Sequence, residues 1–190
     1  AAVQTMRKHN TGLAIHEHRA MHGLLDRELG AGVYDKGVIV DFSMSMVVIA
    51  KIMRLLGVDS LHGGAPKGKM ENYNEPMLIQ QALQEDITPV TDMTLGQNWY
   101  GMKGVWHTAS GGLHPGTIGE SITRLGENLI VQAGGGVLGH PWGIEAGVEA
   151  MVQARDIAMQ KEDLNKWIIE HPDSALAKAA HYWGFDPKFV

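Results

Sequence analysis

Apolar residues recur at helical spacing in four stretches of the chain. In the first, positions from Ile49 to Leu56 follow the i, i+3, i+4, i+7 pattern of an amphipathic helix, and Gly57 is suited to end it. The same spacing predicts three more helices, within residues 79–87, 118–125 and 144–152. We therefore expect at least four helices, each with one apolar face directed towards a core.

A short apolar run precedes each of these helices. The runs have the length of buried strands, and they cover residues 13–19, 58–62, 104–108 and 129–132. A helix end at residues 1–10 comes before the first run, so we expect the chain to begin inside an element. Two short helices follow the last repeat, in a tail over residues 161–190. The fourfold strand–helix alternation predicts an α/β fold with a parallel sheet.

The glycine-rich segments follow predicted strands and precede predicted helices. They read GGAPKGKM from Gly63, SGG from Ser110 and GGG from Gly134. Parallel α/β folds bind their ligands at the carboxyl ends of the strands, in loops of this kind. We therefore expect these segments to belong to one functional site.

Composition excludes several classes of function. The 190 residues are 44% hydrophobic and 19% charged, a balance typical of a folded domain. The net charge of −5 argues against a nucleic-acid partner, and the absence of cysteine excludes disulfides, thiolate metal sites and a cysteine nucleophile. No apolar run reaches the ~18 residues of a membrane span, and no signal segment opens the chain. We expect a cytoplasmic protein without a membrane partner.

The segment HEHRAMH, which starts at His16, concentrates imidazoles beside an arginine. Three interpretations remain open. His16, His18 and His22 could converge on a metal ion, although Arg19 would repel a cation there. Two histidines could instead pack in the fold beside a surface arginine. The interpretation we favour is an anion site, because the planar guanidinium of Arg19 matches a phosphate group.

The turns SGG and GGG predict a phosphate site of a different kind. Backbone N–H groups that follow a strand and open a helix can cradle a phosphate without side chains. Two such turns after consecutive strands match the phosphate site of an α/β barrel. His114-Pro115, directly after SGG, indicates a helix start. Together with Arg19, the two turns predict a site for a small molecule that carries two phosphates.

Four motifs in this order are similar to those of one family. HRAMH, LHGG…GKM, ASGGLHPG and QAGGGVLGHPWG resemble the large subunit of ribulose-1,5-bisphosphate carboxylase/oxygenase (Rubisco), most closely the archaeal type. The resemblance implies that residues 1–160 are strands five to eight of a (β/α)8 barrel and that residues 161–190 are a helical tail packed on it. It also implies a lyase that fixes carbon dioxide.

The resemblance also implies roles for individual residues. Arg19 and His62, assisted by His22, would hold the C5 phosphate of the bisphosphate. His18 would contact the C3 hydroxyl region and could move protons, and Lys69 would stabilise the new carboxylate. The residues implied at the sugar hydroxyls and the other phosphate are Ser110, and Gly111, Gly112, Gly134 and Gly135 respectively.

The chain departs from the family in its loops. Archaeal members normally carry Thr where this chain has Ala65, and Pro66 and Lys67 are unusual as well. Residues 29–42 are longer than the usual connection. Both departures fall in segments between a predicted strand and the next helix.

The family's first barrel half, with its carbamylated lysine and Mg²⁺ ligands, has no counterpart in this sequence. We therefore expect a complementary amino-terminal half as a second polypeptide, or self-association of half-barrels into a dimer or larger assembly. Two other functions stay open. The chain could belong to a Rubisco-like enolase or isomerase that acts on a related sugar phosphate, or to a non-catalytic, phosphate-binding assembly module.

Overall fold

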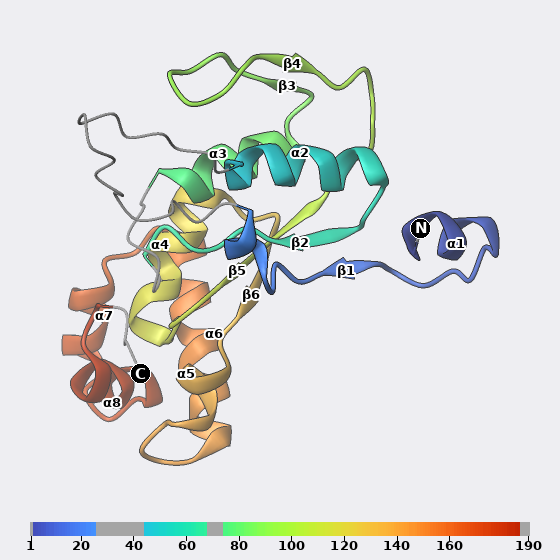
Figure 1. Cartoon of the computed structure of the whole chain (residues 1–190). Coiled ribbons are helices and arrows are strands. Elements are labelled where there is room, and N and C mark those ends of the chain that lie inside the picture. Colours follow the sequence, from blue (N-terminus) through green and yellow to red (C-terminus); the bar gives the residue numbers. More distant parts are fainter. Residues whose placement is uncertain (1, 26–43, 68–73, 187–190) are drawn as a thin grey trace, which may run out of the picture. The chain divides into compact units, whose positions relative to one another are not determined.

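The computed structural model describes residues 2–25, 44–67 and 74–186 (Figure 1). These residues form two compact units, one from residues 1–62 and 78–105 and the other from residues 63–77 and 106–190. Each unit combines parallel strands with helices packed on its own apolar core. Lys69 and the long connection at 29–42 lie outside the described residues.

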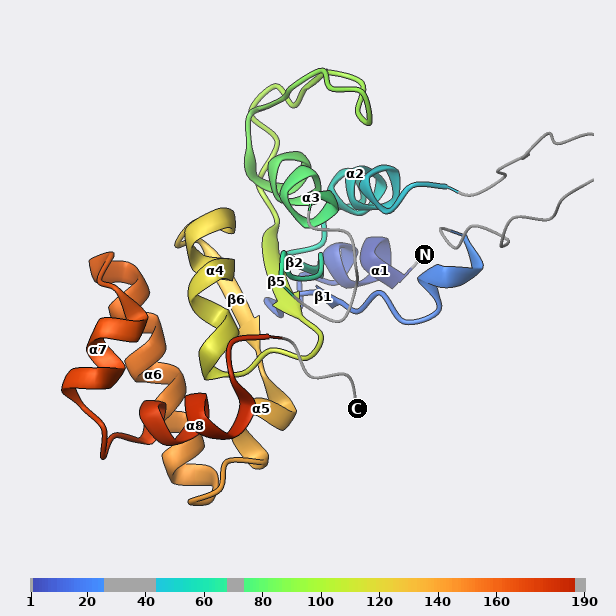
Figure 2. The same ribbon diagram turned by 90° about the vertical axis from the view of Figure 1, so that its left-hand side faces the viewer.

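The first unit is built around helices α2 and α3, which lie side by side in both views (Figures 1 and 2). Strands β1 and β2 pair in parallel, with His16 opposite Ser60, and β3 pairs antiparallel with β4. The core lies between α2, α3 and the start of β2. The elements of this unit are α1 (Ala2–Lys8), β1 (His16–Glu17), the 3-10 helix η1 (His22–Leu24), α2 (Met46–Leu56), β2 (Ser60–His62), most of α3 (Glu75–Gln84), β3 (Ile87–Thr88) and β4 (Gln97–Asn98).

The second unit has its helices gathered on one side of a parallel pair of strands (Figure 2). Its core residues include Ala109 of the first strand, Ile118 of the next helix and Leu176 of the last. The elements are β5 (Trp106–Ser110), α4 (Pro115–Leu125), β6 (Leu129–Gln132), α5 (Gly134–Leu138), α6 (Ile144–Gln160), α7 (Leu164–Glu170) and α8 (Ala175–Trp183). The tail helices α7 and α8 contact α6, and their packing on a complete barrel stays a prediction.

The structure confirms the parallel α/β class and most predicted elements. α2 ends at Leu56, and Gly57 adopts the left-handed conformation, with φ of 85°, that glycine allows without steric cost. α4 begins at Pro115 with His114 as its cap, as the sequence indicates. Among the described residues, no helix is both long enough and apolar enough to cross a membrane.

Two predicted boundaries are wrong near the glycine-rich and polar segments. The strand expected over 13–19 is only two residues long, and Leu13 is 62% exposed, because β1 has β2 as its one strand neighbour within this unit. The GGG segment, expected as a bare turn before the 144–152 helix, instead opens the separate helix α5 at Gly134.

The helix expected over 79–87 begins and ends earlier than predicted, at Glu75 and Gln84. α3 ends at Gln84, and Ile87 lies in β3 instead. The carbonyls of the last turn have partners outside the helix, which explains the early end. Leu83 accepts from the backbone N–H of Val105, and Ala82 accepts from the side chain of Arg54.

The buried guanidinium of Arg54 joins three segments of the first unit. The side chain is only 1% exposed and lies over the ring of Trp99, 4.2 Å from its centroid. Burial lowers its pKa, and the nearby carboxylates of Asp86 and Glu85 partly oppose that effect. Its nitrogens donate to four backbone carbonyls, those of Ala82 (3.0 Å), Glu85 (2.8 Å), Met102 (2.9 Å) and Lys103 (3.3 Å).

Replacing this side chain should destabilise the first unit strongly. Arg54→Met keeps most of the volume but removes every donor, so four carbonyls lose their partner and the free energy of unfolding should fall by roughly 3–5 kcal/mol. Denaturant unfolding measures the change. Arg155→Met is the control, because Arg155 is exposed and pairs only with adjacent Asp156, and it should stay within about 0.5 kcal/mol of the parent. Equal effects of both variants would contradict the assigned role.

Candidate functional site

The carboxyl ends of β1 and β2 bring histidines into contact. Parallel pairing places both strand ends at the same edge, so the residues after β1 lie near the end of β2. The imidazole of His62, the last residue of β2, lies 4.8 Å from that of His16 and 4.4 Å from that of His18, measured between ring centroids. His16 and His18, two residues apart in HEHRAMH, therefore both contact the ring of His62.

Hydrogen bonds continue through this cluster. Nε2 of His16 lies 2.9 Å from Nε2 of His62, and Nδ1 of His16 lies 2.7 Å from Oγ of Ser60. His62 is 2% exposed, whereas His16 and His18 are exposed. The contact between the two Nε2 atoms needs one of them protonated and the other bare. The cluster is therefore a polar chain that runs from a buried serine to a buried imidazole.

The electrostatic surroundings keep His62 neutral. Burial, followed by the neighbouring His18, His16 and Arg19 in that order of effect, lowers the pKa of His62 to about 4. Arg19 is half-buried, and its permanent positive charge is close enough to act on His62. A fixed cation beside a neutral imidazole is suited to an anion. His22 opens η1 after this cluster.

A metal ion does not fit the histidine cluster. Across residues 2–25, 44–67 and 74–186, no three His, Cys, Asp or Glu side chains converge on a cation position. The imidazole nitrogens of His16 and His62 bond to each other instead of pointing at a common centre. The described residues thus give the metal interpretation of HEHRAMH no set of three ligands, and the anion interpretation stays a prediction.

The second unit holds a glycine-lined pocket at the carboxyl ends of β5 and β6. Ser110 and Gln132, the last residues of these strands, lie opposite each other in the register. The pocket has a volume of about 260 Å³ and reaches the aromatic ring of Trp183. Its lining includes the four glycines predicted from the sequence, namely Gly111, Gly112, Gly134 and Gly135. Five of the ten lining residues are glycines, which contribute only backbone to the wall.

The first two glycines of this pocket are required by the backbone. Gly111 and Gly112 have φ angles of 101° and 72°, a region that side chains disfavour. The chain can therefore turn sharply from the end of β5 to His114. The histidine caps α4 by accepting from Gly116 N–H and exchanging hydrogen bonds with Thr117 in a capping box.

A buried histidine also explains a glycine after β2. The ring of His107 is 0% exposed, and its Nε2 lies 2.8 Å from the carbonyl oxygen of Gly64. A Cβ on Gly63 would lie 2.2 Å from this ring, so only glycine fits there. Ala65, where the family normally has Thr, is buried in the core of the second unit. The start of the GGAPKGKM segment is thus packed.

Lys67, two residues after Ala65, forms ion pairs with two carboxylates. Its ammonium nitrogen lies 3.3 Å from a carboxylate oxygen of Asp186 and 3.9 Å from one of Glu120. Both contacts belong to the second unit. Lys69, the catalytic lysine predicted from the sequence, lies beyond this point and outside the described residues, so its role stays a prediction.

Sequence reasoning did not single out Ser60, Gln132 or Trp183. Ser60 contacts His16 only through the strand register, which the sequence does not specify. Gln132 is the last residue of the strand predicted over 129–132, and Trp183 comes from α8, about 50 residues further along the chain. The sequence could have indicated Ser60 by its position two residues before His62, because residues at that spacing lie on the same face of a strand.

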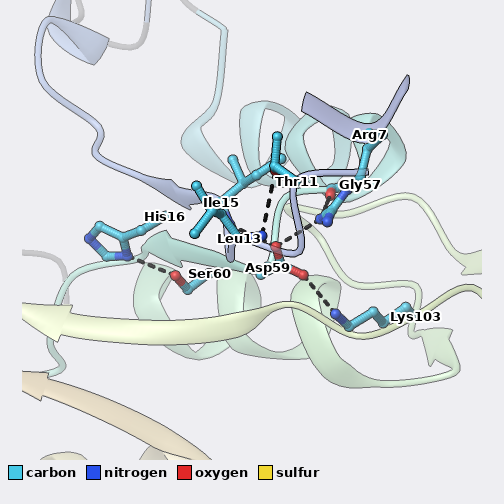
Figure 3. Close-up of polar contacts among 9 residues, drawn as sticks. All are labelled: Arg7, Thr11, Leu13, Ile15, His16, Gly57, Asp59, Ser60 and Lys103. Atoms are coloured by element: carbon cyan, nitrogen blue, oxygen red, sulfur yellow. Dashed lines mark hydrogen bonds and ion pairs between the residues drawn. The ribbon is translucent and has the colours of Figure 1, made fainter. Parts of the chain in front are cut away.

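The carboxylate of Asp59 positions β1 beside β2 (Figure 3). One oxygen accepts from the backbone N–H of Ile15 and from the guanidinium of Arg7, both at 2.7 Å, and the other lies 2.7 Å from the ammonium of Lys103. Arg7 also donates to the carbonyl of Gly57. The Lys103 contact, followed by those of Ile15 and Arg7, holds the pKa of Asp59 well below its usual range, although burial opposes this.

The parallel strands and the glycine-lined pocket at their carboxyl ends are typical of α/β proteins that bind ligands at strand ends. Residues 1–183 match the family described as ribulose bisphosphate carboxylase large chain, catalytic domain, and the chain belongs to this family.

Relatives at substantial identity include ribulose bisphosphate carboxylases from two archaea. The chain is 37% identical to that of Pyrococcus furiosus over 187 residues, covering 97% of this chain and 39% of the relative. It is 38% identical to that of Methanocaldococcus jannaschii, covering 96% of this chain and 41% of the relative. A dimeric archaeal Rubisco structure from Hyperthermus butylicus matches with a TM-score of 0.79 and 36% identity, over 97% of this chain and 41% of that one.

The coverage of these matches shows which part of its relatives the chain corresponds to. The chain spans about two fifths of the length of the curated relatives it matches. The matched part is the carboxy-terminal part of the archaeal structures, where the sequence motifs place strands five to eight of the barrel.

Acid should weaken the first unit through Asp59. Because its folded-state pKa is depressed, the stabilisation is present above the ordinary pKa of about 3.9 and is lost as the pH falls below it. Asp59→Asn should lower the free energy of unfolding at pH 7 by about 1–3 kcal/mol and flatten its fall with acid. Unfolding followed from pH 7 to pH 3 tests this. The exposed Asp92→Asn is the control, and an unchanged acid limb in Asp59→Asn would refute the prediction.

Proposed function

We propose that the chain is the carboxy-terminal portion of a Rubisco large subunit, which binds ribulose 1,5-bisphosphate and stabilises the carboxylation intermediate. The observation that carries this proposal is the pocket at the ends of β5 and β6. Four glycines from two separate family motifs line that one cavity. The SGG and GGG turns, with Gly112 and Gly134 22 positions apart in sequence, gain a common purpose if a ligand lies between them.

The glycine pocket is suited to one phosphate of the substrate. A phosphate is compact, and backbone N–H groups can approach it closely where no Cβ intervenes. A Cβ on Gly134 or Gly135 would meet no protein atom within 4 Å, so packing does not require these two glycines. An exposed wall without side chains supports a role in ligand approach. Ser110, half-buried at the end of β5, would bond the sugar hydroxyls.

The histidine cluster is suited to the C5 phosphate. Arg19 supplies a permanent charge and a planar set of donors, and His62 supplies a neutral imidazole beside it, with His22 assisting. His18 touches the ring of His62 and is exposed, so it could reach the C3 hydroxyl region and move a proton. The charge of Arg19 would supply affinity for the phosphate, and the hydrogen bonds of the imidazoles would orient it.

Lys69 is the residue of this chain that we assign to the carboxylation step. Negative charge develops on the new carboxylate only after carbon dioxide adds to the enediolate, so a lysine ammonium there stabilises a late transition state. The described residues do not fit a Mg²⁺ site, and we assign no step of this chain to the metal. Its ligands would come from the first barrel half, together with the carbamylated lysine.

A complementary chain would also cover apolar surface. Val48, Ile52 and Leu55 follow helical spacing along α2 and are 44%, 39% and 56% exposed. Ile144, Val148 and Val152 form a similar exposed line on α6. Such faces favour burial against another chain. We propose that the first barrel half is this partner and that the complex assembles further into dimers or larger oligomers.

Loss of the Arg19 charge should weaken bisphosphate binding selectively. In the protein assembled by co-expression with a first barrel half, Arg19→Ala should lose roughly 1.5–3 kcal/mol of binding free energy for the bisphosphate. A monophosphate without the C5 phosphate should lose much less. Calorimetric titration of both ligands measures the difference, with Arg155→Ala as the surface control. Equal losses for both ligands would show that Arg19 does not contact the C5 phosphate. If co-expression gave no more soluble chain, the proposal that the first barrel half is the partner would fail.

Loss of the Lys69 charge should separate two steps of the reaction. Lys69→Met keeps most of the side-chain length, so carboxylation should fall by at least ~100-fold while enolisation continues. Fixation of labelled carbon dioxide reports the first, and exchange of the substrate C3 proton with solvent reports the second. Lys166→Met, on the exposed face of α7, is the control. If both rates fall together, Lys69 serves binding or loop closure instead, and if neither falls, the residue has no role in the reaction.

A further inference from the structure

Two buried histidines connect the glycine pocket to the tail helix α8. His114 belongs to the ASGGLHPG motif and His140 to the QAGGGVLGHPWG motif, so each comes from the same motif as one of the pocket's two turns. Nε2 of His140 lies 3.0 Å from the carbonyl oxygen of Ala175, the first residue of α8. Nε2 of His114 lies 2.7 Å from the carbonyl oxygen of Asp186, just beyond the end of α8. Both turns are therefore bonded to the tail, at its two ends.

The partners of these rings determine where each proton lies. Nδ1 of His114 accepts from the backbone N–H of Gly116. Nδ1 of His140 accepts from the backbone N–H of Trp142. A backbone N–H can only donate and a carbonyl oxygen can only accept, so each ring carries its proton on Nε2 and donates it to the tail. The direction of both bonds to the tail is thus fixed.

The bonds to the tail bring the indole of Trp183 to the pocket. Its ring centroid lies 5.6 Å from that of His114 and 6.0 Å from that of His140. The backbone after Trp183 is equally close to the first turn of α4, because a Cβ on Gly116 would overlap the carbonyl oxygen of Gly184. The glycine in the motif therefore permits the same approach that the histidines stabilise.

We propose that α8 completes the phosphate pocket, with Trp183 as a wall that contacts the bound phosphate and with His114 and His140 as positioning residues that hold this wall in place. The other described residues of the lining lie within 111–114 and 132–136, so Trp183 brings a separate element to the cavity. The volume of about 260 Å³ lies below the ~300–1,000 Å³ of pockets for drug-sized ligands, which suits one small group. The assignment of a phosphate rests on the proposed function.

An aromatic wall strengthens the binding of a phosphate by backbone. The indole covers part of the cavity with apolar surface and so keeps water from that side of the ligand. Hydrogen bonds from backbone N–H groups to phosphate oxygens are stronger where water is excluded, because the local dielectric constant is lower. A ring that is already held in place also costs little ordering when the ligand binds. Loss of a bond to the tail should therefore weaken binding without removing any contact to the ligand itself.

Fluorine NMR of the assembled protein labelled with 5-fluorotryptophan tests the wall directly. Trp183→Phe and Trp167→Phe assign the two signals. Trp167 is the control, because it packs against the same core from α7 and does not line the pocket. Titration with inorganic phosphate should shift the Trp183 signal to saturation and leave the Trp167 signal unchanged. A Trp183 signal that does not respond to phosphate would overturn the proposal.

Two substitutions of His140 test the positioning role. His140→Asn keeps an acceptor for the Trp142 N–H but loses the donor to Ala175, whereas His140→Gln keeps that donor. His140→Asn should raise the dissociation constant of phosphate, measured from the Trp183 signal, about fivefold, and His140→Gln should restore it to within about twofold. His171→Asn is the control, because His171 is exposed and bonds within the tail. An unchanged constant in His140→Asn would overturn the positioning role.

Nitrogen NMR tests the two bonds to the tail without any ligand. In the protein labelled with ¹⁵N-histidine, long-range proton–nitrogen spectra at pH 7 should show His114 and His140 protonated at Nε2 and bare at Nδ1. His114→Asn and His140→Asn assign the signals. A ring of either residue that is bare at Nε2 would overturn its bond to the tail.

Ribulose 1,5-bisphosphate separates this inference from the proposed function. If inorganic phosphate shifts the Trp183 signal but the bisphosphate does not bind, the wall stands and the proposed function fails. If the bisphosphate binds while the Trp183 signal stays unchanged, the wall is wrong and the proposed function stands.

Discussion

The histidine cluster depends on the carboxylate of Asp59. Its contacts with the Ile15 amide, Arg7 and Lys103 hold the segment before β1 against the start of β2. That placement determines which residues face each other across the two strands, and a shift of one residue would turn the imidazole of His16 to the opposite face. The contact of His16 with Ser60 and His62 therefore depends on the carboxylate that directly precedes Ser60 in the chain.

Much of this architecture could be predicted from the sequence. Helical spacing from Ile49 to Leu56 and the cap at His114-Pro115 are local signals, and both elements are present. The four predicted glycines at the β5–β6 pocket were recognisable because they follow a strand and precede a helix, where backbone N–H groups can bind a phosphate. Their place after consecutive predicted strands already indicated that the two turns belong together, and the family motifs added which residues would hold which phosphate.

Nonlocal contacts account for what the sequence did not predict. The apolar pattern of α3 continues to Ile87, but Arg54 and Val105 take the carbonyls that a longer helix would need. The contact of Ser60 with His16 depends on strand register, and Trp183 reaches the pocket through the packing of α8. Each of these features depends on which segments meet in space, and spacing along the chain carries little information about that.

The brevity of β1 has a consequence for motion. The strand has two residues, and the segment before it buries little apolar surface, with Ile15 only partly buried against the core. Segments with so few buried contacts open locally at a free energy well below that of global unfolding. The α2–α3 core can therefore persist while β1 detaches. Its amide protons should exchange with solvent early, so any ligand seated on Arg19 would slow exchange in β1 before it affects the core.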